Sequence, residues 1–158
     1  MASKYVVTAA HCMDVNGKPV PKSDVKVRIG DHDLAEIDET TIGKTIGVAS
    51  ITNHENYSDF SLINDISLLE LEEEVDLNTY TPACLAQTSD TDTFDGKMAQ
   101  VYGWGRVSDN GIFSDKLLEV SVPVVNNTQC ATSMSSFLHG LGTICAGGEE
   151  GKDACEVT

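Results

Sequence analysis

The amino-acid sequence predicts an all-β protein. Apolar residues alternate with polar ones along Val25–Ile29 and again along Leu118–Val124, which is the period of a strand with one buried face. The stretches of this kind are short, and loops rich in Gly, Pro, Asp and Ser separate them. The sequence contains no internal repeat and no long amphipathic helical pattern. We therefore expect short strands joined by loops.

Four segments of the first half have strand character. In each of them apolar residues recur within a short run bounded by polar or glycine-containing loops. They are Tyr5–Ala10, Val25–Ile29, Thr45–Thr52 and Asp65–Leu71. The intervening segments are predicted to be loops, because they are polar or contain Gly and Pro: Met13–Asp24, Asp31–Thr41 and His54–Asn64.

The second half follows a segment, residues 78–97, that is rich in Thr, Asp and Ser and is predicted to link two regions of the chain. Three further strand regions are expected: Met98–Gly105, Leu118–Val124 and Thr143–Cys145. Pro123 cannot donate a backbone hydrogen bond, so an edge or bulged position is expected for its strand. Asn126 or Asn127 can cap a short helix that runs to Met134.

Composition narrows the classes of function. The 158 residues suffice for one ordinary domain, and 25 acidic against 10 basic residues give a net charge of −15. This charge repels nucleic acid and anionic membrane surfaces and weakly attracts basic substrates. No apolar run approaches the roughly 20 residues of a membrane-spanning helix. Five cysteines indicate an oxidising compartment, and because the count is odd at least one is expected to be unpaired.

Two residues are candidates for proton chemistry. His11 follows the apolar run that begins at Val6, and histidine is the side chain best suited to take and return a proton near neutral pH. Asp65 lies directly before an apolar strand, where a carboxylate can be buried beside an imidazole, fix its tautomer and stabilise its charged form. Each has a simpler alternative: a histidine that packs at the end of a strand, and an aspartate that forms a turn.

Several motifs resemble those of the chymotrypsin/trypsin-like serine proteases. They are T-A-A-H-C at residues 8–12, N-D-I-S-L-L at 64–69, G-W-G at 103–105 and I-C-A-G at 144–147. The resemblance implies an all-β fold of two antiparallel Greek-key β-barrels, both incomplete in this chain. Residues 1–77 would belong to the first barrel, 78–97 to the linker and 98–158 to the second barrel. It also implies that His11 is the general base and acid, that Asp65 orients it, and that Cys130 and Cys145 form a disulfide.

The resemblance assigns two further sites. Asp153 stands two residues before Cys155, where this family places the floor of the substrate pocket, and a carboxylate there implies cleavage after Lys or Arg. The alternative is a surface aspartate in an acidic loop. Asp31 and Asp38 match two ligand positions of the trypsin calcium loop, whereas Thr41 stands where a third acid is usual. A solvated acidic loop without calcium is the alternative there.

In this family the nucleophile motif, x-G-D-S-G-G-P, follows the cysteine matched by Cys155, but this sequence reads Glu156-Val157-Thr158. We therefore expect a fragment, truncated at both ends, of a secreted serine endopeptidase that cleaves polypeptides after Lys or Arg. Protein protease inhibitors are expected as further partners, and no cofactor is required apart from the calcium considered for Asp31 and Asp38. The fragment itself is expected to be inactive because it lacks the nucleophilic serine. The alternative is a non-catalytic homologue of such proteases that acts as a binding module.

Overall fold

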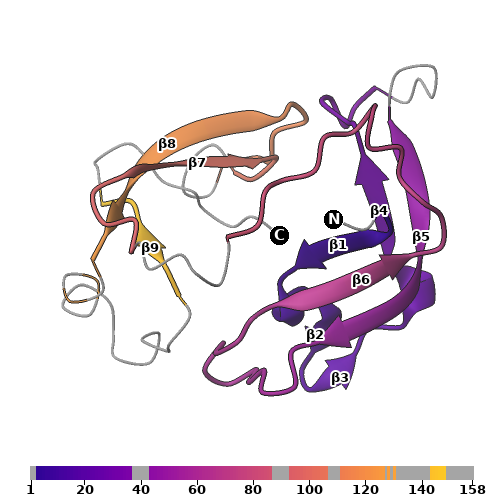
Figure 1. The fold of residues 1–158 in the computed structure, drawn as a ribbon, viewed down its shortest axis with the longest axis horizontal. Coiled ribbons are helices and arrows are strands. Elements are labelled where there is room, and N and C mark those ends of the chain that lie inside the picture. Colours follow the sequence, from indigo (N-terminus) through magenta and orange to yellow (C-terminus); the bar gives the residue numbers. More distant parts are fainter. Residues whose placement is uncertain are drawn as a thin grey trace. The chain divides into compact units, whose positions relative to one another are not determined.

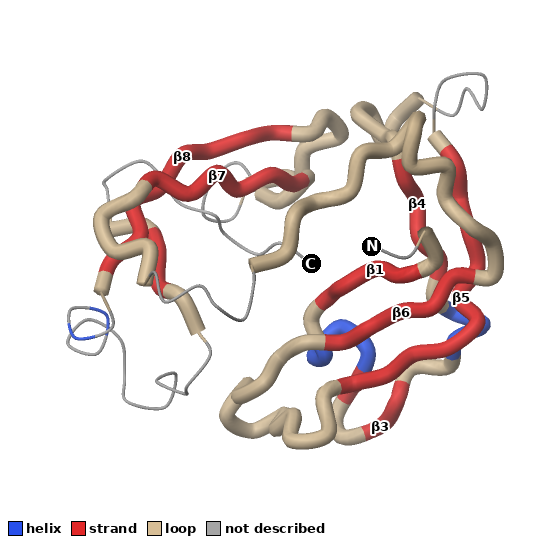
Figure 2. The backbone as a smooth tube through the Cα atoms, viewed as in Figure 1, coloured by secondary structure: helices blue, strands red, loops and turns tan. Residues whose placement is uncertain are grey.

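The computed structural model describes residues 3–36, 43–86, 93–106, 111–126, 128, 130 and 143–148. Strands and loops account for most of these residues (Figures 1 and 2), which confirms the predicted all-β class. None of the helices found in these ranges is long and apolar enough to cross a membrane.

The chain forms two compact units. Of the described residues, 3–31 and 43–86 belong to unit 1, and 32–36, 93–106, 111–126, 128, 130 and 143–148 belong to unit 2. The barrel boundaries inferred from the sequence stay predictions.

Unit 1 contains a four-stranded antiparallel sheet. Its strands are β1 (Tyr5–Thr8), β4 (Lys26–Ile29), β5 (Lys44–Asn53) and β6 (Ser67–Leu71). They lie in the order β1-β6-β5-β4 (Figure 1), so the first strand of the chain pairs with the last strand of this unit. The pairing of β5 with β6 shifts register between Val48 and Ser50. Because β6 is flanked by a strand on each side, its start is held in place, and with it the residue two positions before it, Asp65.

Alternate side chains of this sheet, together with Met13 from the turn after β1, form the core of unit 1. Met13, Val48 and Leu69 are buried and pack against one another, with Val27 partly buried beside them. Leu69 is 3% exposed, whereas its neighbour Leu68 is 40% exposed. This alternation is expected of a strand with one buried face, and it fixes the register, because a slip by one residue would expose Leu69.

The chain after β1 departs from the sequence prediction. The predicted strand Tyr5–Ala10 ends at Thr8, and residues Ala10–Met13 form a turn of 3₁₀ helix, η1. Pairing with β6 stops where Thr8 lies opposite Ser67, so the backbone can turn at this point. Ala10 is fully buried in the turn.

A small hairpin lies within the predicted loop Met13–Asp24. Its strands are β2 (Asp14–Val15) and β3 (Lys18–Pro19), and a 3₁₀ turn, η2 (Lys22–Asp24), follows. Asn16 and Gly17 connect the strands with φ of 55° and 72°. An Asn-Gly pair favours this turn because both residues tolerate the left-handed region. Strands of two residues are too short to show a periodic pattern in the sequence.

Unit 2 contains a three-stranded antiparallel sheet. Its strands are β7 (Met98–Gly103), β8 (Leu118–Val125) and β9 (Cys145–Ala146), in the order β7-β8-β9 (Figure 1). β8 is therefore the middle strand and not the expected edge strand, and its register with β7 up to Pro123 shows no bulge, which was the other expectation. Pro123 pairs with Met98 of β7, whereas β9 pairs only with Val124 and Val125. A proline is tolerated here because it lies just beyond the last residue that β9 pairs with.

Residues 32–36 belong to unit 2, although β4 and β5 on either side of them belong to unit 1. Asp33 forms an isolated antiparallel bridge with the segment that precedes β8. The backbone N–H of Leu117 donates to the carbonyl oxygen of His32 at 2.8 Å, and the indole Nε1 of Trp104 donates to the same oxygen at 3.3 Å. An early segment of the chain is thus bonded to residues that flank strands β7 and β8 of unit 2.

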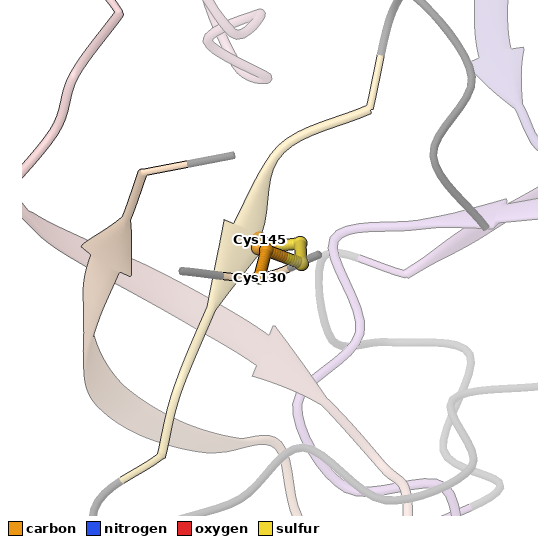
Figure 3. The surroundings of a disulfide bond; sticks show 2 residues. All are labelled: Cys130 and Cys145. Carbon is orange, nitrogen blue, oxygen red and sulfur yellow. A yellow bond between two sulfur atoms is a disulfide. The ribbon is translucent and has the colours of Figure 1, made fainter. Parts of the chain in front are cut away.

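A disulfide joins Cys130 to Cys145 (Figure 3), the pair that the resemblance implies. Their Cα atoms lie 6.2 Å apart, within the usual range for disulfides. The strand predicted at Thr143–Cys145 is found as β9, which begins at Cys145. Of the helix predicted from Asn126 or Asn127 to Met134, residues 128 and 130 are described and are helical, and most of the rest lies outside the described residues.

Candidate active site

The ends of two paired strands bring His11 and Asp65 together. His11 lies in η1 just after β1, and Asp65 lies just before β6. Because β1 and β6 are antiparallel and Thr8 pairs with Ser67, the end of β1 and the start of β6 share one edge of the sheet. Two residues separated by 54 positions in the sequence thereby become neighbours.

Asp65 receives two hydrogen bonds from His11. The backbone N–H of His11 donates to Oδ1 at 2.8 Å, and the ring atom Nδ1 lies 2.7 Å from Oδ2. Partial burial by itself would raise the pKa of Asp65, but the hydrogen bonds and charge of His11, with the backbone amide of Ala10, hold that pKa below its ordinary value. The carboxylate is therefore ionised at neutral pH.

The bond to Asp65 determines which ring nitrogen of His11 is basic. An ionised carboxylate only accepts hydrogen bonds, so Nδ1 carries the proton, and Nε2 of the neutral ring is an acceptor. The Sγ atom of Cys12 lies 3.4 Å from Nε2. Burial, and then the charge of Asp65, raises the pKa of Cys12, so the protonated thiol donates to Nε2. This contact was not expected from the sequence, in which the adjacency of residues 11 and 12 is the one signal for it.

An imidazole in this state can act as a general base. Nε2 can take a proton from a hydroxyl group placed before it, and the ionised Asp65 then stabilises the charged ring. Proton transfer by a positioned side chain contributes about 10²–10⁴-fold to the rate of a reaction. Since the thiol of Cys12 is bonded to Nε2, a hydroxyl nucleophile has to displace that thiol before it can be activated.

A tyrosine in the loop between β5 and β6 interacts electrostatically with Asp65. Burial raises the pKa of Tyr57, and the charges of Asp65, Asp14 and Asp59 raise it further. The phenol is therefore neutral and can donate a hydrogen bond. His54–Asn64 was expected only as a polar loop, and a tyrosine in a polar loop carries no pattern that assigns it to a site.

The residues predicted for calcium and for the substrate pocket are only partly described. Asp38 and Asp153 lie outside the described residues. Asp31 forms an ion pair with Nε of Arg28, and its side chain is 11% exposed. A calcium ion requires 6–8 oxygen ligands, and within the described ranges no group of three His, Cys, Asp or Glu side chains could hold a metal. Asp31, the one ligand candidate that is described, is thus paired with a cation.

The fold and the His11–Asp65 pair define a class of protein: an all-β chain that holds a histidine–carboxylate pair where two antiparallel strands meet. The sequence model of the trypsin family matches residues 1–156. The chain belongs to the trypsin family, which confirms the resemblance seen in its motifs.

The chain is also similar to curated proteases over nearly its whole length. It is 37% identical to venom serine protease Bi-VSP of Bombus ignitus, over 99% of this chain and 44% of that protein. It is 33% identical to Trypsin-1 of Gadus morhua, over 99% of this chain and 60% of that protein. Serine protease filzig of Drosophila melanogaster is 33% identical over 99% of this chain and 9% of its own length. The chain thus spans less than two thirds of the length of each of these relatives.

Proposed function

We propose that the protein acts in proteolysis as a serine-type endopeptidase whose general base is His11. The observation that carries this proposal is the pair of hydrogen bonds from His11 to Asp65, which leaves Nε2 as the basic atom. Membership of the trypsin family supports it. Nε2 would take the proton of a serine hydroxyl as that oxygen attacks the peptide carbonyl, and would return the proton to the leaving amine. Asp65 would hold the ring and stabilise its charged form.

The 158-residue polypeptide by itself is proposed to be inactive. None of its serines stands in a G-D-S-G-G-P motif, the segment that supplies the nucleophile in this family. Without a nucleophile, the general base has no proton to take and no covalent intermediate forms. Turnover of an arginyl ester by this polypeptide, removed by His11→Ala, would contradict the proposal.

Asp153 is proposed to select substrates with Lys or Arg before the cut. The support is its position two residues before Cys155 and the likeness of the chain to proteins named as trypsins. A charge-assisted hydrogen bond between a pocket carboxylate and a substrate cation contributes about 1.5–3 kcal/mol. In the active protease, Asp153→Ser should therefore reduce cleavage after Lys and Arg and leave cleavage after apolar residues intact. An unchanged preference would reject this role.

The function is tested with the longest product of the gene that contains these residues. It should cut polypeptides, and mass spectrometry of the products should place the cuts after Lys or Arg. His11→Ala should abolish the cutting, whereas His32→Ala, in which a histidine of unit 2 is replaced, should not. Cutting that survives His11→Ala would overturn the assignment of the general base.

A second candidate is a non-catalytic homologue that binds polypeptides. One observation favours it: the thiol of Cys12 is bonded to the atom that a nucleophile would need. A product that binds protein protease inhibitors or polypeptides but never cuts them would support this candidate against the enzyme.

We propose an extracellular protein, since the disulfide between Cys130 and Cys145 requires an oxidising compartment and a relative is named as a venom protease.

A structural calcium ion at Asp31 and Asp38 stays a prediction. It would raise the midpoint of thermal unfolding when calcium is added and lower it with a chelator, and both effects should be absent in Asp31→Asn.

A further inference from the structure

The residue before Asp65 has an unusual backbone conformation. Asn64 has φ of 56°, in the left-handed region that non-glycine residues rarely adopt and that asparagine tolerates better than most. Asp65 follows immediately, and β6 begins two residues after that. A change of φ at Asn64 therefore redirects the chain at the point where the carboxylate is presented.

The side chain of Asn64 ties the two ends of its loop together. Its Nδ2 donates to the carbonyl oxygen of Asn56 at 2.9 Å. Its own carbonyl oxygen accepts a hydrogen bond from the N–H of Ile66 at 2.7 Å, and the N–H of His54 donates to the carbonyl oxygen of Ile66 at 3.0 Å. Asn64 is thus held through its backbone on one side and its amide on the other.

The bonds between His11 and Asp65 depend on where this segment places the carboxylate. Oδ1 and Oδ2 are bonded to two different atoms of His11, at 2.8 and 2.7 Å. A carboxylate keeps two such bonds together only in a narrow range of orientations, because both donors belong to one residue. Strand β6 holds the backbone that follows Asp65, and the bonds of Asn64 hold the backbone that precedes it.

We propose that Asn64 is a positioning residue, whose left-handed backbone and amide bond to Asn56 aim the carboxylate of Asp65 at His11. Asn64 acts through Asp65 and touches no reacting atom. This inference rests on the proposed function for its catalytic consequence, but its structural consequence can be measured without any activity.

The direct test is the pKa of Asp65, followed by carbon-detected NMR in the protein and its variants. Asn64→Ala removes the amide and disfavours positive φ, so the bonds from His11 should weaken and the pKa of Asp65 should rise. Asn64→Gly keeps the backbone conformation and removes only the amide, so the pKa should rise by less. Asn16→Ala is the matched control, because Asn16 has φ of 55° in the β2–β3 turn and makes no bond to Asp65. It should lower stability and leave the pKa of Asp65 unchanged.

The outcomes separate this inference from the proposed function. In an active protease, Asn64→Ala should lower kcat by about tenfold or more, with KM nearly unchanged and partial recovery in Asn64→Gly. If the protein never cuts polypeptides, the pKa measurement still decides the role of Asn64. An unchanged pKa of Asp65 in Asn64→Ala overturns the inference. If Asn64→Ala does not fold, an unchanged pKa in Asn64→Gly overturns it.

Discussion

Nδ1 of His11 lies 2.7 Å from Oδ2 of Asp65, although 54 positions separate the two residues in the sequence. The antiparallel pairing of β1 with β6 is the cause, since it brings the end of one strand to the start of the other. Asp65 accepts from the ring and from the backbone of the same residue, so the imidazole cannot rotate without breaking a bond.

Replacing Asp65 by Asn should invert the tautomer of His11. An amide can donate to Nδ1, which moves the ring proton to Nε2 and removes the basic atom from its position. In the active protease, kcat should fall by roughly 10⁴-fold. Nitrogen NMR of the His11 ring measures the tautomer directly. A fully active Asp65→Asn variant would show that Asp65 has no orienting role.

The pair should stabilise the fold in a pH-dependent way. The pKa of Asp65 in the folded protein lies below its ordinary value of 3.8. Its stabilising contribution is therefore complete well above that value and is lost as the pH falls through the lower pKa of the folded state. Between pH 7 and acid pH, the free energy of unfolding should drop more in the wild type than in Asp65→Asn. Equal losses in the two proteins would exclude this contribution.

Cys12 should react slowly with alkylating reagents. Its pKa is raised by burial and by the charge of Asp65, and the thiolate is the reactive form. Cys84 is exposed and serves as the internal comparison, with each peptide followed by mass spectrometry. Asp65→Asn should accelerate the labelling of Cys12 and leave that of Cys84 unchanged. Faster labelling of Cys12 than of Cys84 in the wild type would contradict the contact with His11.

Neighbouring leucines of β6 should differ sharply in their contribution to stability. Leu69 is 3% exposed and packs in the core of unit 1, so Leu69→Ala should reduce the free energy of unfolding by about 2–5 kcal/mol. Leu68→Ala removes the same atoms from a side chain that is 40% exposed, and should cost no more than about 1 kcal/mol. Denaturant unfolding measures both. Similar losses in the two variants would mean that the register of β6 is different.

The sequence predicts strands well where they are long enough to show their period. β5 and β8 were expected within one residue of their bounds, because apolar residues recur along each of these stretches and loops bound them. The hairpin of β2 and β3 was missed, since two residues cannot show a period. The position of Pro123 was misjudged because strand order depends on pairing far along the chain, and a single residue does not reveal it.

The candidate site was predictable in its residue types and in the pairing of Asp65 with His11, but not in the contacts around that pair. Motifs singled out His11 and Asp65, and only the fold shows the bonds between them. The sequence did not indicate the positioning role proposed for Asn64, because that role depends on a φ of 56° and on a hydrogen bond across a loop. The contact of Cys12 with Nε2 depends likewise on the turn that follows β1.

Because residues 32–36 belong to unit 2, the gene cannot be divided into two parts that each encode one complete unit. If the chain were divided between Ala86 and Gln87, the first fragment would contain residues 32–36. Leu117 and Trp104, which donate hydrogen bonds to that segment, would be in the second fragment. The second fragment would in turn lack the carbonyl group of His32 that two of its donors use. Separately expressed halves would therefore each be incomplete, and a split-protein reporter built at this junction would regain its structure only when both pieces meet.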